Sequence, residues 1–328
     1  MKYAMTTDHP YEGQPDALPC VHTVLRYLKD LSGKGILTGQ HTQTMEQEEL
    51  RRIQSLTGTL PALVGFELLS YSPNINYLDT DDVCQEEIRR NYGTLSRAWE
   101  WARQKGLITF TWHWFSPLYG HGKSFFAENT PFDARRAVID GTEENRALLS
   151  DLDVMAGLLR PFCDQGVPIL WRPFHEGDGD WFWWGSKGPE TVKALYRIMH
   201  HRFTRLHHLN NLIWVWNSPI PACYPGDDVV DIISRDLYPE PHTHTSHREE
   251  LRELKAITGA DKITLIGEIG PIPDIDALCE EKSPWVSFMT WSGAFCLEEK
   301  YGSSLESVGG KNRRSKGIKG FAGFTWSL

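Results

Sequence analysis

The chain has 328 residues, of which 40% are hydrophobic and 23% charged, and its formal net charge is −9. This composition is typical of a soluble globular protein with a large core, and it excludes disordered, collagen-like and coiled-coil chains. Acidic residues (43) outnumber basic ones (34). We therefore expect neither nucleic acid nor a membrane as a partner, because cationic side chains bind both.

Short runs rich in Val, Ile, Leu and Trp alternate with longer segments of helical period, as expected for parallel strands joined by crossover helices. Strands are predicted at residues 36–41, 62–70, 107–115, 168–176, 212–218, 229–238, 263–269 and 285–292. Helices are predicted at residues 45–56, 86–104, 143–165, 190–208, 247–258 and 274–281. The link between the fifth and sixth strands is too short and too rich in Pro and Gly to hold a full helix.

Eight strands with helices between them predict an α/β fold, a (β/α)8 TIM barrel, whose active site lies at the C-terminal ends of the strands. A doubly wound open sheet is the alternative, but no glycine-rich phosphate-binding motif follows the first strand. We expect one catalytic domain over residues 1–328, with an atypical tail at 298–328 that is rich in Gly, Ser, Lys and Arg. The long loop at 116–142 is expected to be functional.

The first residues and the cysteines bear on the cellular location. Residues 1–10 contain no apolar signal core, and no run reaches the roughly 18 apolar residues of a membrane span. We expect a secreted or cell-surface protein in its mature form, without its signal peptide, and keep a cytoplasmic protein as the alternative. The six cysteines are spread singly and include no C-x-x-C pair, so they leave the redox compartment open.

The fourth predicted strand ends in the ionisable residues Arg172, His175 and Glu176, and the loop that follows, 177–185, contains four aromatic residues. In a barrel these groups lie at the carboxyl end of the strand, where active sites form. Sugars present C–H faces that stack on aromatic rings and hydroxyl edges that need charged or amide partners. The combination indicates a sugar-binding site.

The seventh predicted strand contains one carboxylate, Glu268, among small and apolar neighbours. A lone buried carboxylate is costly unless it is paired or functional. His41 and Glu67 lie at the ends of the first two predicted strands. Each could reach the cleft or have a structural role, and the sequence favours neither. Taken singly, Glu176 and Glu268 could each belong to a structural ion pair. Together, on the fourth and seventh of eight strands, they form the two-carboxylate arrangement of glycoside hydrolysis.

Short motifs follow most of the predicted strands. The most specific is W-R-P-F-H-E followed by W-F-W-W-G, within residues 171–185. Weaker motifs are L-T-G-Q (37–40), W-H-W (112–114), W-V-W-N (214–217), Y-P-G-D (224–227), D-L-Y-P (236–239), G-E (267–268) and W-S-G (291–293). Together they resemble glycoside hydrolase family 26, the β-mannanases of a clan of (β/α)8 retaining glycosidases, over about residues 35–295.

The resemblance implies catalytic roles for the two carboxylates. Glu176 is the expected acid/base and Glu268 the expected nucleophile, with Tyr238 positioning the nucleophile and His175 forming a hydrogen bond near it. Glu176 must then hold a proton near neutral pH. We expect an anionic neighbour and partial burial by Trp181 to raise the pKa of Glu176.

The resemblance also implies a set of substrate-binding residues. His113 and Trp181 are expected to line the sugar site around the cleavage point. Trp291 is expected to form an apolar floor beneath the reacting sugar. Arg172 is expected to brace the two catalytic carboxylates from below.

The implied activity is retaining hydrolysis of internal β-1,4-mannosidic bonds in mannan, galactomannan or glucomannan, by a monomer without a cofactor or metal. One alternative is the same mechanism on another β-glycan, β-1,3-xylan or mixed-linkage glucan. A second is a sugar-binding barrel without catalysis. A third is a metal-dependent amidohydrolase that uses His113 and His175.

Overall fold

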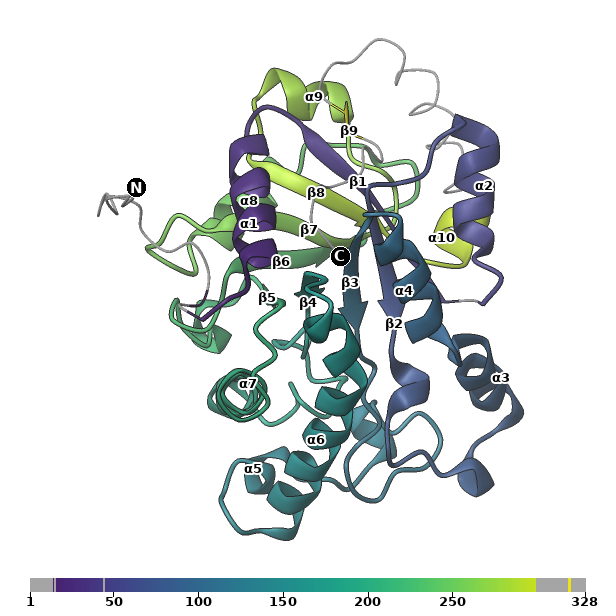
Figure 1. Cartoon of the computed structure of the whole chain (residues 1–328), viewed down its shortest axis with the longest axis vertical. Coiled ribbons are helices and arrows are strands. Elements are labelled where there is room, and N and C mark those ends of the chain that lie inside the picture. The colour runs from purple at the N-terminus through teal and green to yellow at the C-terminus, as the bar shows by residue number, and fades with distance from the viewer. Residues whose placement is uncertain (1–13, 15, 44, 299–317, 320–328) are drawn as a thin grey trace.

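The computed structural model describes residues 14, 16–43, 45–298 and 318–319. Its eight barrel strands are all parallel, and the sheet closes because β1 pairs with both β2 and β8. The barrel strands are β1 (Ile36–Thr42), β2 (Leu63–Glu67), β3 (Leu107–Thr111), β4 (Ile169–Trp171), β5 (Leu212–Asn217), β6 (Ile232–Leu237), β7 (Ile263–Ile269) and β8 (Trp285–Thr290) (Figure 1). The prediction of eight strands and of a (β/α)8 barrel is confirmed.

The fourth strand is shorter than its predicted range of 168–176. It ends at Trp171, because Pro173 has no N–H to donate to a neighbouring strand. Phe174 and Glu176 both adopt left-handed backbone, each with φ of 51°, a conformation that side chains with a Cβ rarely take. The chain therefore turns sharply after β4, and Glu176 lies on this turn rather than in the strand.

Helices surround the barrel. The described α-helices are α1 (Pro19–Leu31), α2 (Glu48–Thr57), α3 (Asp82–Asn91), α4 (Thr94–Arg103), α5 (Ala134–Ala137), α6 (Glu143–Asp164), α7 (Pro189–His201), α8 (Arg248–Lys255), α9 (Ile275–Glu280) and α10 (Ala294–Leu297). The predicted helix at 86–104 is divided into α3 and α4, because Gly93 has a φ of 90° that a continuous helix cannot accommodate. The predicted helix at 190–208 changes after α7 into a π-helical turn, Arg202–Leu206.

The first helix, α1, lies outside the elements predicted from the sequence. Its apolar residues, among them Val21, Val24 and Leu28, pack against residues near the beginnings of the strands, such as Leu37 and Leu170. This face of α1 therefore covers the N-terminal end of the barrel. The C-terminal end is left to the loops that carry the site.

Most tryptophans belong to the core. The fully buried ones are Trp114, Trp171, Trp183, Trp184, Trp214, Trp216 and Trp285. They lie in the hydrophobic core that spreads from the strands to the surrounding helices. Trp181 differs, since 46% of its surface is exposed, so it is free to contact a ligand.

The ends of the chain are described only in part. Most of the predicted tail, 298–328, lies outside the described residues, and within it Ile318–Lys319 (β9) pairs with β1. The assignment of a single domain with an atypical tail stays a prediction. In the part of the chain that the structure describes, every helix is too short or too polar to cross a membrane.

Candidate active site

Three carboxylates meet at the C-terminal end of the barrel. Glu176 follows β4, whereas Asp236 and Glu268 are partners in the register of β6 and β7. One carboxylate oxygen of each lies within 4.8 Å of the other two. The sequence predicts the approach of Glu176 and Glu268 but misses Asp236. Asp236 follows the polar residues Ser234 and Arg235 in β6, so it does not interrupt an apolar run as Glu268 does.

Glu268 is buried and both of its oxygens are held. The Arg172 guanidinium donates to Oε1, and the Tyr238 hydroxyl donates to Oε2 at 2.5 Å. Burial and the negative charge of Glu268 keep the pKa of Tyr238 well above its ordinary value, so the hydroxyl stays protonated and remains a donor. Tyr238 therefore lies against Glu268, where the prediction placed it.

Arg172 contacts Glu268, one of the two carboxylates that it was expected to brace, and also Asp236, which the prediction did not include. It is only 3% exposed, and besides Glu268 it binds Asp236 at 3.1 Å and the Thr111 hydroxyl at 2.9 Å. It therefore braces Glu268 and Asp236, and among the described residues its hydrogen-bond partners do not include Glu176. Its guanidinium is almost inaccessible to solvent, and its assignment to the substrate-binding residues stays a prediction.

Asn217, at the end of β5, links the turn that carries Glu176 to Asp236. Its Oδ1 accepts the backbone N–H of Glu176 at 2.7 Å, and its Nδ2 donates to Asp236 at 2.8 Å. A Cβ on Gly267 would lie 2.6 Å from Asp236 and 2.8 Å from Asn217, so only glycine fits before Glu268. Burial, with the charge of Glu268 added, raises the pKa of Asp236 to about 7.

Glu176 has the surroundings of a proton donor. Burial raises the pKa of its carboxyl, and the nearby charge of Asp236 raises it further. The Trp181 indole N–H donates to Glu176 Oε2 at 2.8 Å and acts in the opposite direction. The anionic neighbour and the partial burial that the sequence led us to expect are both present, and Asp236 is the neighbour that contributes most.

The loop after β3 supports the loop that carries Trp181. The backbone N–H of Ala127 donates to the carbonyl of Trp181 at 2.7 Å, and the N–H of Trp183 donates to the carbonyl of Phe125 at 3.1 Å. Part of the long segment predicted to be functional, 116–142, thus fixes the aromatic loop beside Glu176.

Two histidines and one glutamate form a chain beside the carboxylates. His113 Nδ1 lies 2.7 Å from a carboxylate oxygen of fully buried Glu67, and His113 Nε2 lies 3.3 Å from His175 Nε2. Burial alone would lower the pKa of His113, but the charge and hydrogen bond of Glu67 outweigh it and raise the pKa. Burial and neighbouring cationic groups keep the pKa of His175 well below its ordinary value.

The contacts from Glu67 through His113 to His175 bear on two predictions made from the sequence. Glu67 also accepts the backbone N–H groups of Leu69 and His113, so it is a structural residue that fixes the His113 ring. His175 was expected to form a hydrogen bond near the nucleophile. In the described part of the chain, its Nε2 contacts His113 and its Nδ1 has no hydrogen-bond partner, so no bond to Glu268 is present.

Trp291 stacks on His41, with ring centroids 4.0 Å apart and an angle of 22° between the planes. His113 meets the same indole nearly edge-on at 6.1 Å, so Trp291 lies in the same site. His41 is fully buried, and neither ring nitrogen has a hydrogen-bond partner among the described residues. Burial keeps its pKa well below the ordinary value, and the neutral ring can lie flat against the indole.

Among the described residues, Glu176, Asp236 and Glu268 are the one group whose geometry could hold a metal ion. Arg172 already contributes a positive charge to two of the three carboxylates. The group thus carries its own counter-charge, and the arrangement is suited to proton transfer and nucleophilic attack rather than to a cation.

Comparison with known proteins agrees with this chemistry. The model of Glycosyl hydrolase family 26 matches residues 14–307. A mannan endo-1,4-beta-mannosidase of Thermothelomyces thermophilus is 34% identical over 297 residues, which cover 88% of this chain and 58% of the relative. The chain spans about half the length of the curated relatives it matches.

Two solved structures superpose closely, each with a TM-score of 0.82 and 30% sequence identity. One is the GH26-CBM35 β-(1,4)-mannanase of Podospora anserina, with 97% of this chain and 70% of that chain covered. The other is a β-mannanase from a symbiotic protist of the termite Reticulitermes speratus, in complex with a gluco-manno-oligosaccharide, with 95% and 97% covered. Both are described as β-mannanases, and each superposition covers nearly the whole of this chain.

Proposed function

Because the chain belongs to glycosyl hydrolase family 26, we propose that it hydrolyses internal β-1,4-mannosidic bonds in mannan, galactomannan or glucomannan with retention of configuration. The approach of Glu176 and Glu268, with oxygens within 4.8 Å, carries the proposal. Retaining glycosidases hold their carboxyl groups about 5–5.5 Å apart, whereas inverting ones leave about 6.5–9.5 Å for a water molecule. The names of the relatives, mannan endo-1,4-beta-mannosidases, support mannan as the substrate.

The first step forms a covalent intermediate. A carboxylate oxygen of Glu268 attacks the anomeric carbon, and the bond from this carbon to the leaving oxygen breaks. Glu176 gives its proton to that oxygen, so the leaving sugar departs as an alcohol. Arg172 and Tyr238 orient the attacking carboxylate through the hydrogen bonds described above, and the raised pKa of Glu176 supplies the proton.

The second step releases the glycone. Glu176, now ionised, takes a proton from a water molecule that attacks the anomeric carbon, and the bond to Glu268 breaks. The two inversions restore the β configuration, and both carboxyl groups return to their starting protonation states. Asn217 holds the backbone of Glu176 in place, so the same carboxyl group can act as acid and then as base.

The surroundings suit an uncharged sugar. Trp181 is half exposed beside Glu176, and Trp291 offers a ring face supported by His41. Aromatic faces bind the C–H faces of sugars. The net charge of −9 suits a neutral polysaccharide better than a polyanion.

We extend the proposal to the setting of the enzyme. It acts as a monomer on an extracellular polysaccharide, as a secreted or cell-surface protein, and needs no cofactor. Sedimentation of the purified chain tests the monomer, and activity in the presence of a chelator tests the absence of a metal requirement.

The proposal is tested by incubating the protein with mannan, galactomannan, β-1,3-xylan and mixed-linkage glucan and sizing the products over time. We expect early mixed mannooligosaccharides from the two mannans and little release from the other glycans. Release of a single disaccharide from mannan would indicate attack from a chain end. Hydrolysis of xylan or mixed-linkage glucan in place of mannan would overturn the substrate, and absence of any hydrolysis would indicate a sugar-binding barrel.

A further inference from the structure

Gln40 is a buried amide in β1, directly before His41 in the chain. Successive side chains of a strand point to opposite faces of the sheet. His41 faces the active site, where it stacks on Trp291, so the Gln40 side chain points away from the site, toward α2. There it lines a small cavity together with Ile53 and Thr57 of α2. Neither step of the proposed hydrolysis uses this polar group.

The amide of Gln40 connects two neighbouring strands. Its Nε2 lies 2.8 Å from the carbonyl oxygen of His41 and 3.1 Å from those of Thr290 and Trp291. Gln40 and Thr290 are partners in the register of β1 and β8, so the side chain reaches across to the end of β8 and to the residue that follows it. One amide therefore binds the backbone of both residues of the stacked pair, His41 and Trp291.

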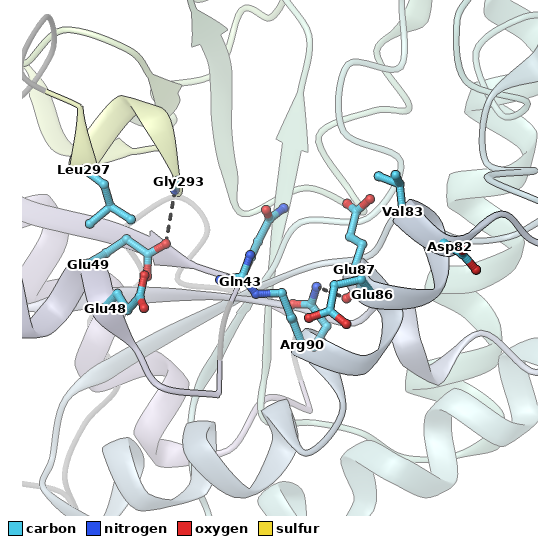
Figure 2. Close-up of a pocket in the computed structure, with 11 residues that line it drawn as sticks. Gln43, Glu48, Glu49, Asp82, Val83, Glu86, Glu87, Arg90, Gly293 and Leu297 are labelled. Atoms are coloured by element: carbon cyan, nitrogen blue, oxygen red, sulfur yellow. Dashed lines mark hydrogen bonds between the residues drawn. The ribbon is translucent and has the colours of Figure 1, made fainter.

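The backbone around Trp291 is held at further points. The N–H of Trp291 donates to the carbonyl of Ile269 at 3.0 Å, and Ile269 directly follows the proposed nucleophile. Two residues farther along, the N–H of Gly293 donates to the buried carboxylate of Glu49 at 3.1 Å (Figure 2). The bond from Gln40 lies between these two points. Together the three bonds fix the backbone that carries the indole relative to the nucleophile strand, β7.

The fold also makes room for the ring on which Trp291 stacks. His41 is fully buried, and a Cβ on Gly65 of β2 would lie only 2.6 Å from Cδ2 of the His41 ring. Glycine at this position therefore lets the imidazole lie against the indole. Trp291 itself is only partly buried, so part of its surface is available to a sugar. A shift of the His41 backbone would move the ring that supports this surface.

Packing alone does not explain an amide at position 40. The Oε1 of Gln40 is buried and has no hydrogen-bond partner among the described residues, and a buried acceptor without a partner is unfavourable. Its surroundings include the apolar side chains of Ile53, Leu60 and Phe288. An apolar side chain of the same size would suit such surroundings, but it would lack the N–H donors that bind the three carbonyl groups.

We propose that Gln40 is a positioning residue for Trp291, which holds the backbone of the indole and of its stacking partner His41 so that the indole lies beneath the reacting sugar. The inference rests on the proposed function, in which Trp291 contacts the sugar, and adds the residue that sets the position of this contact. A misplaced contact stabilises the transition state less, so loss of Gln40 lowers kcat/KM although Gln40 itself touches no substrate.

A double-mutant cycle tests whether Gln40 acts through Trp291. Gln40→Met keeps roughly the size of the side chain and removes both N–H donors. It is combined with Trp291→Ala, and kcat/KM is measured on mannohexaose for the parent, the two single variants and the double variant. Two residues that act independently give losses that multiply, whereas a residue that acts only through the other gives no further loss once that residue is removed.

Asn211→Leu is the matched control. Asn211 is also a fully buried amide, it donates to the carbonyl of Val167 at 2.8 Å, and its Oδ1 has no partner in the described part of the chain. It directly precedes β5 and therefore lies at the opposite end of the barrel from the site. The control measures how much activity is lost when a buried amide is removed away from Trp291.

We expect Gln40→Met to lower kcat/KM on mannohexaose about tenfold and Trp291→Ala about 10²-fold. The double variant should stay within about twofold of Trp291→Ala, because no indole is left to position. Asn211→Leu should stay within about twofold of the parent. Urea denaturation of each variant establishes that it is folded under the conditions of the assay.

Losses that multiply in the double variant, or Gln40→Met activity within about twofold of the parent, would overturn the proposed role. A loss in Asn211→Leu as large as that in Gln40→Met, or a Trp291→Ala variant as active as the parent, would also overturn it. Gln40→Asn keeps the amide on a shorter side chain that cannot span the two strands, and it takes the place of Gln40→Met in the cycle if that variant does not fold. If the unmodified protein hydrolyses none of the tested glycans, the proposed function itself fails and the inference with it.

Discussion

Two groups of carboxylates lie on the same end of the barrel and differ in almost every physical respect. Glu176, Asp236 and Glu268 converge within 4.8 Å and share Arg172. A second set of carboxylates comes from α2 and α3 around a cavity of about 520 Å³ (Figure 2), and its members are Glu48, Glu49, Asp82, Glu86 and Glu87. Several of them, such as Glu86, are exposed to solvent. In the converged group, burial and the neighbouring charges raise the pKa of Glu176 and of Asp236. Only the first group therefore combines the convergence and the burial that proton transfer requires.

The largest effect is expected at the converged group. Replacing the nucleophile in Glu268→Ala should lower kcat/KM on mannan by at least about 10⁴-fold, because no other side chain can form the covalent intermediate. Azide should not restore formation of the β-configured product. Turnover of mannan by this variant within about tenfold of the unmodified protein would contradict the assignment.

Glu176→Ala is the matched partner of this variant. It should also lose mannan hydrolysis, but it keeps the nucleophile. With an aryl mannoside whose leaving group needs no proton, azide should attack the intermediate and give the β-mannosyl azide. The two variants therefore separate the acid/base from the nucleophile by the product each one forms.

The next largest effect is expected at Arg172, the cation that pairs with Asp236 and Glu268. Arg172→Met should cost about 3–5 kcal/mol of stability, because Glu268 and Asp236 would remain buried without their counter-charge. We expect a loss of about 10²–10³-fold in kcat/KM as Glu268 loses its orientation. Urea denaturation and steady-state kinetics measure the two effects. A variant as stable and active as the parent would show that the group is not coupled through Arg172.

A smaller effect is expected from the third carboxylate. Asp236 raises the pKa of Glu176 through its charge, so Asp236→Asn should lower that pKa. Glu176 must be protonated to act as an acid, and activity falls as the pH rises through its pKa. The alkaline limb of kcat/KM against pH should therefore move to lower pH. A limb that stays in place or moves to higher pH would show that Asp236 does not influence the acid.

Asp151 is a buried carboxylate outside both groups. It tests whether burial alone can raise the pKa of a carboxyl group in this protein. Desolvation raises the pKa of Asp151 to about 7, although the Trp114 indole N–H donates to it at 2.8 Å. The folded pKa exceeds the unfolded value, so the contribution of this group to stability is fully present below about pH 4 and is lost as the pH rises toward 7. Asp151→Asn removes the titration and keeps an acceptor for Trp114.

We expect Asp151→Asn to become more stable relative to the parent as the pH rises, by about 1–3 kcal/mol at pH 8. Chemical denaturation at pH 4 and pH 8 measures the change. A difference that is the same at both values would show that Asp151 titrates alike in the folded and unfolded chain.

The smallest effect is expected at the dispersed carboxylates. Asp82→Asn with Glu86→Gln should leave kcat/KM on mannohexaose within about twofold, since both residues are exposed to solvent and neither belongs to the converged group. The pH dependence of kcat/KM should not change, because neither group is part of the converged set. A shifted pH profile in this double variant would show that these carboxylates also influence the groups that control catalysis.

Features that depend on one segment at a time could be predicted from the sequence. The eight strands follow from runs of apolar residues, and Glu268 stands out because it interrupts such a run. The aromatic loop after β4 carries its own composition signal, and Trp181 beside Glu176 follows from it. The division of the helix at Gly93 could also have been predicted, since glycine interrupts helices.

Features that depend on pairing between distant segments could not be predicted. The contact of Asp236 with Glu268 requires the register of β6 and β7, which contains an irregularity after Arg235. The sharing of Arg172 between these two carboxylates depends on which way the side chain points from the end of β4. The bond from Glu67 to His113 likewise joins two strands, and neither residue has a local pattern that indicates its partner.

The most direct test of the central claim is the configuration of the first product. Proton NMR during hydrolysis of mannohexaose by the unmodified protein follows the anomeric signals before mutarotation. If Glu176 and Glu268 act as acid/base and nucleophile at their observed separation, the new reducing ends appear first as the β anomer and equilibrate later. Initial appearance of the α anomer would contradict the account, because it requires a single displacement by water and a wider separation of the two carboxylates.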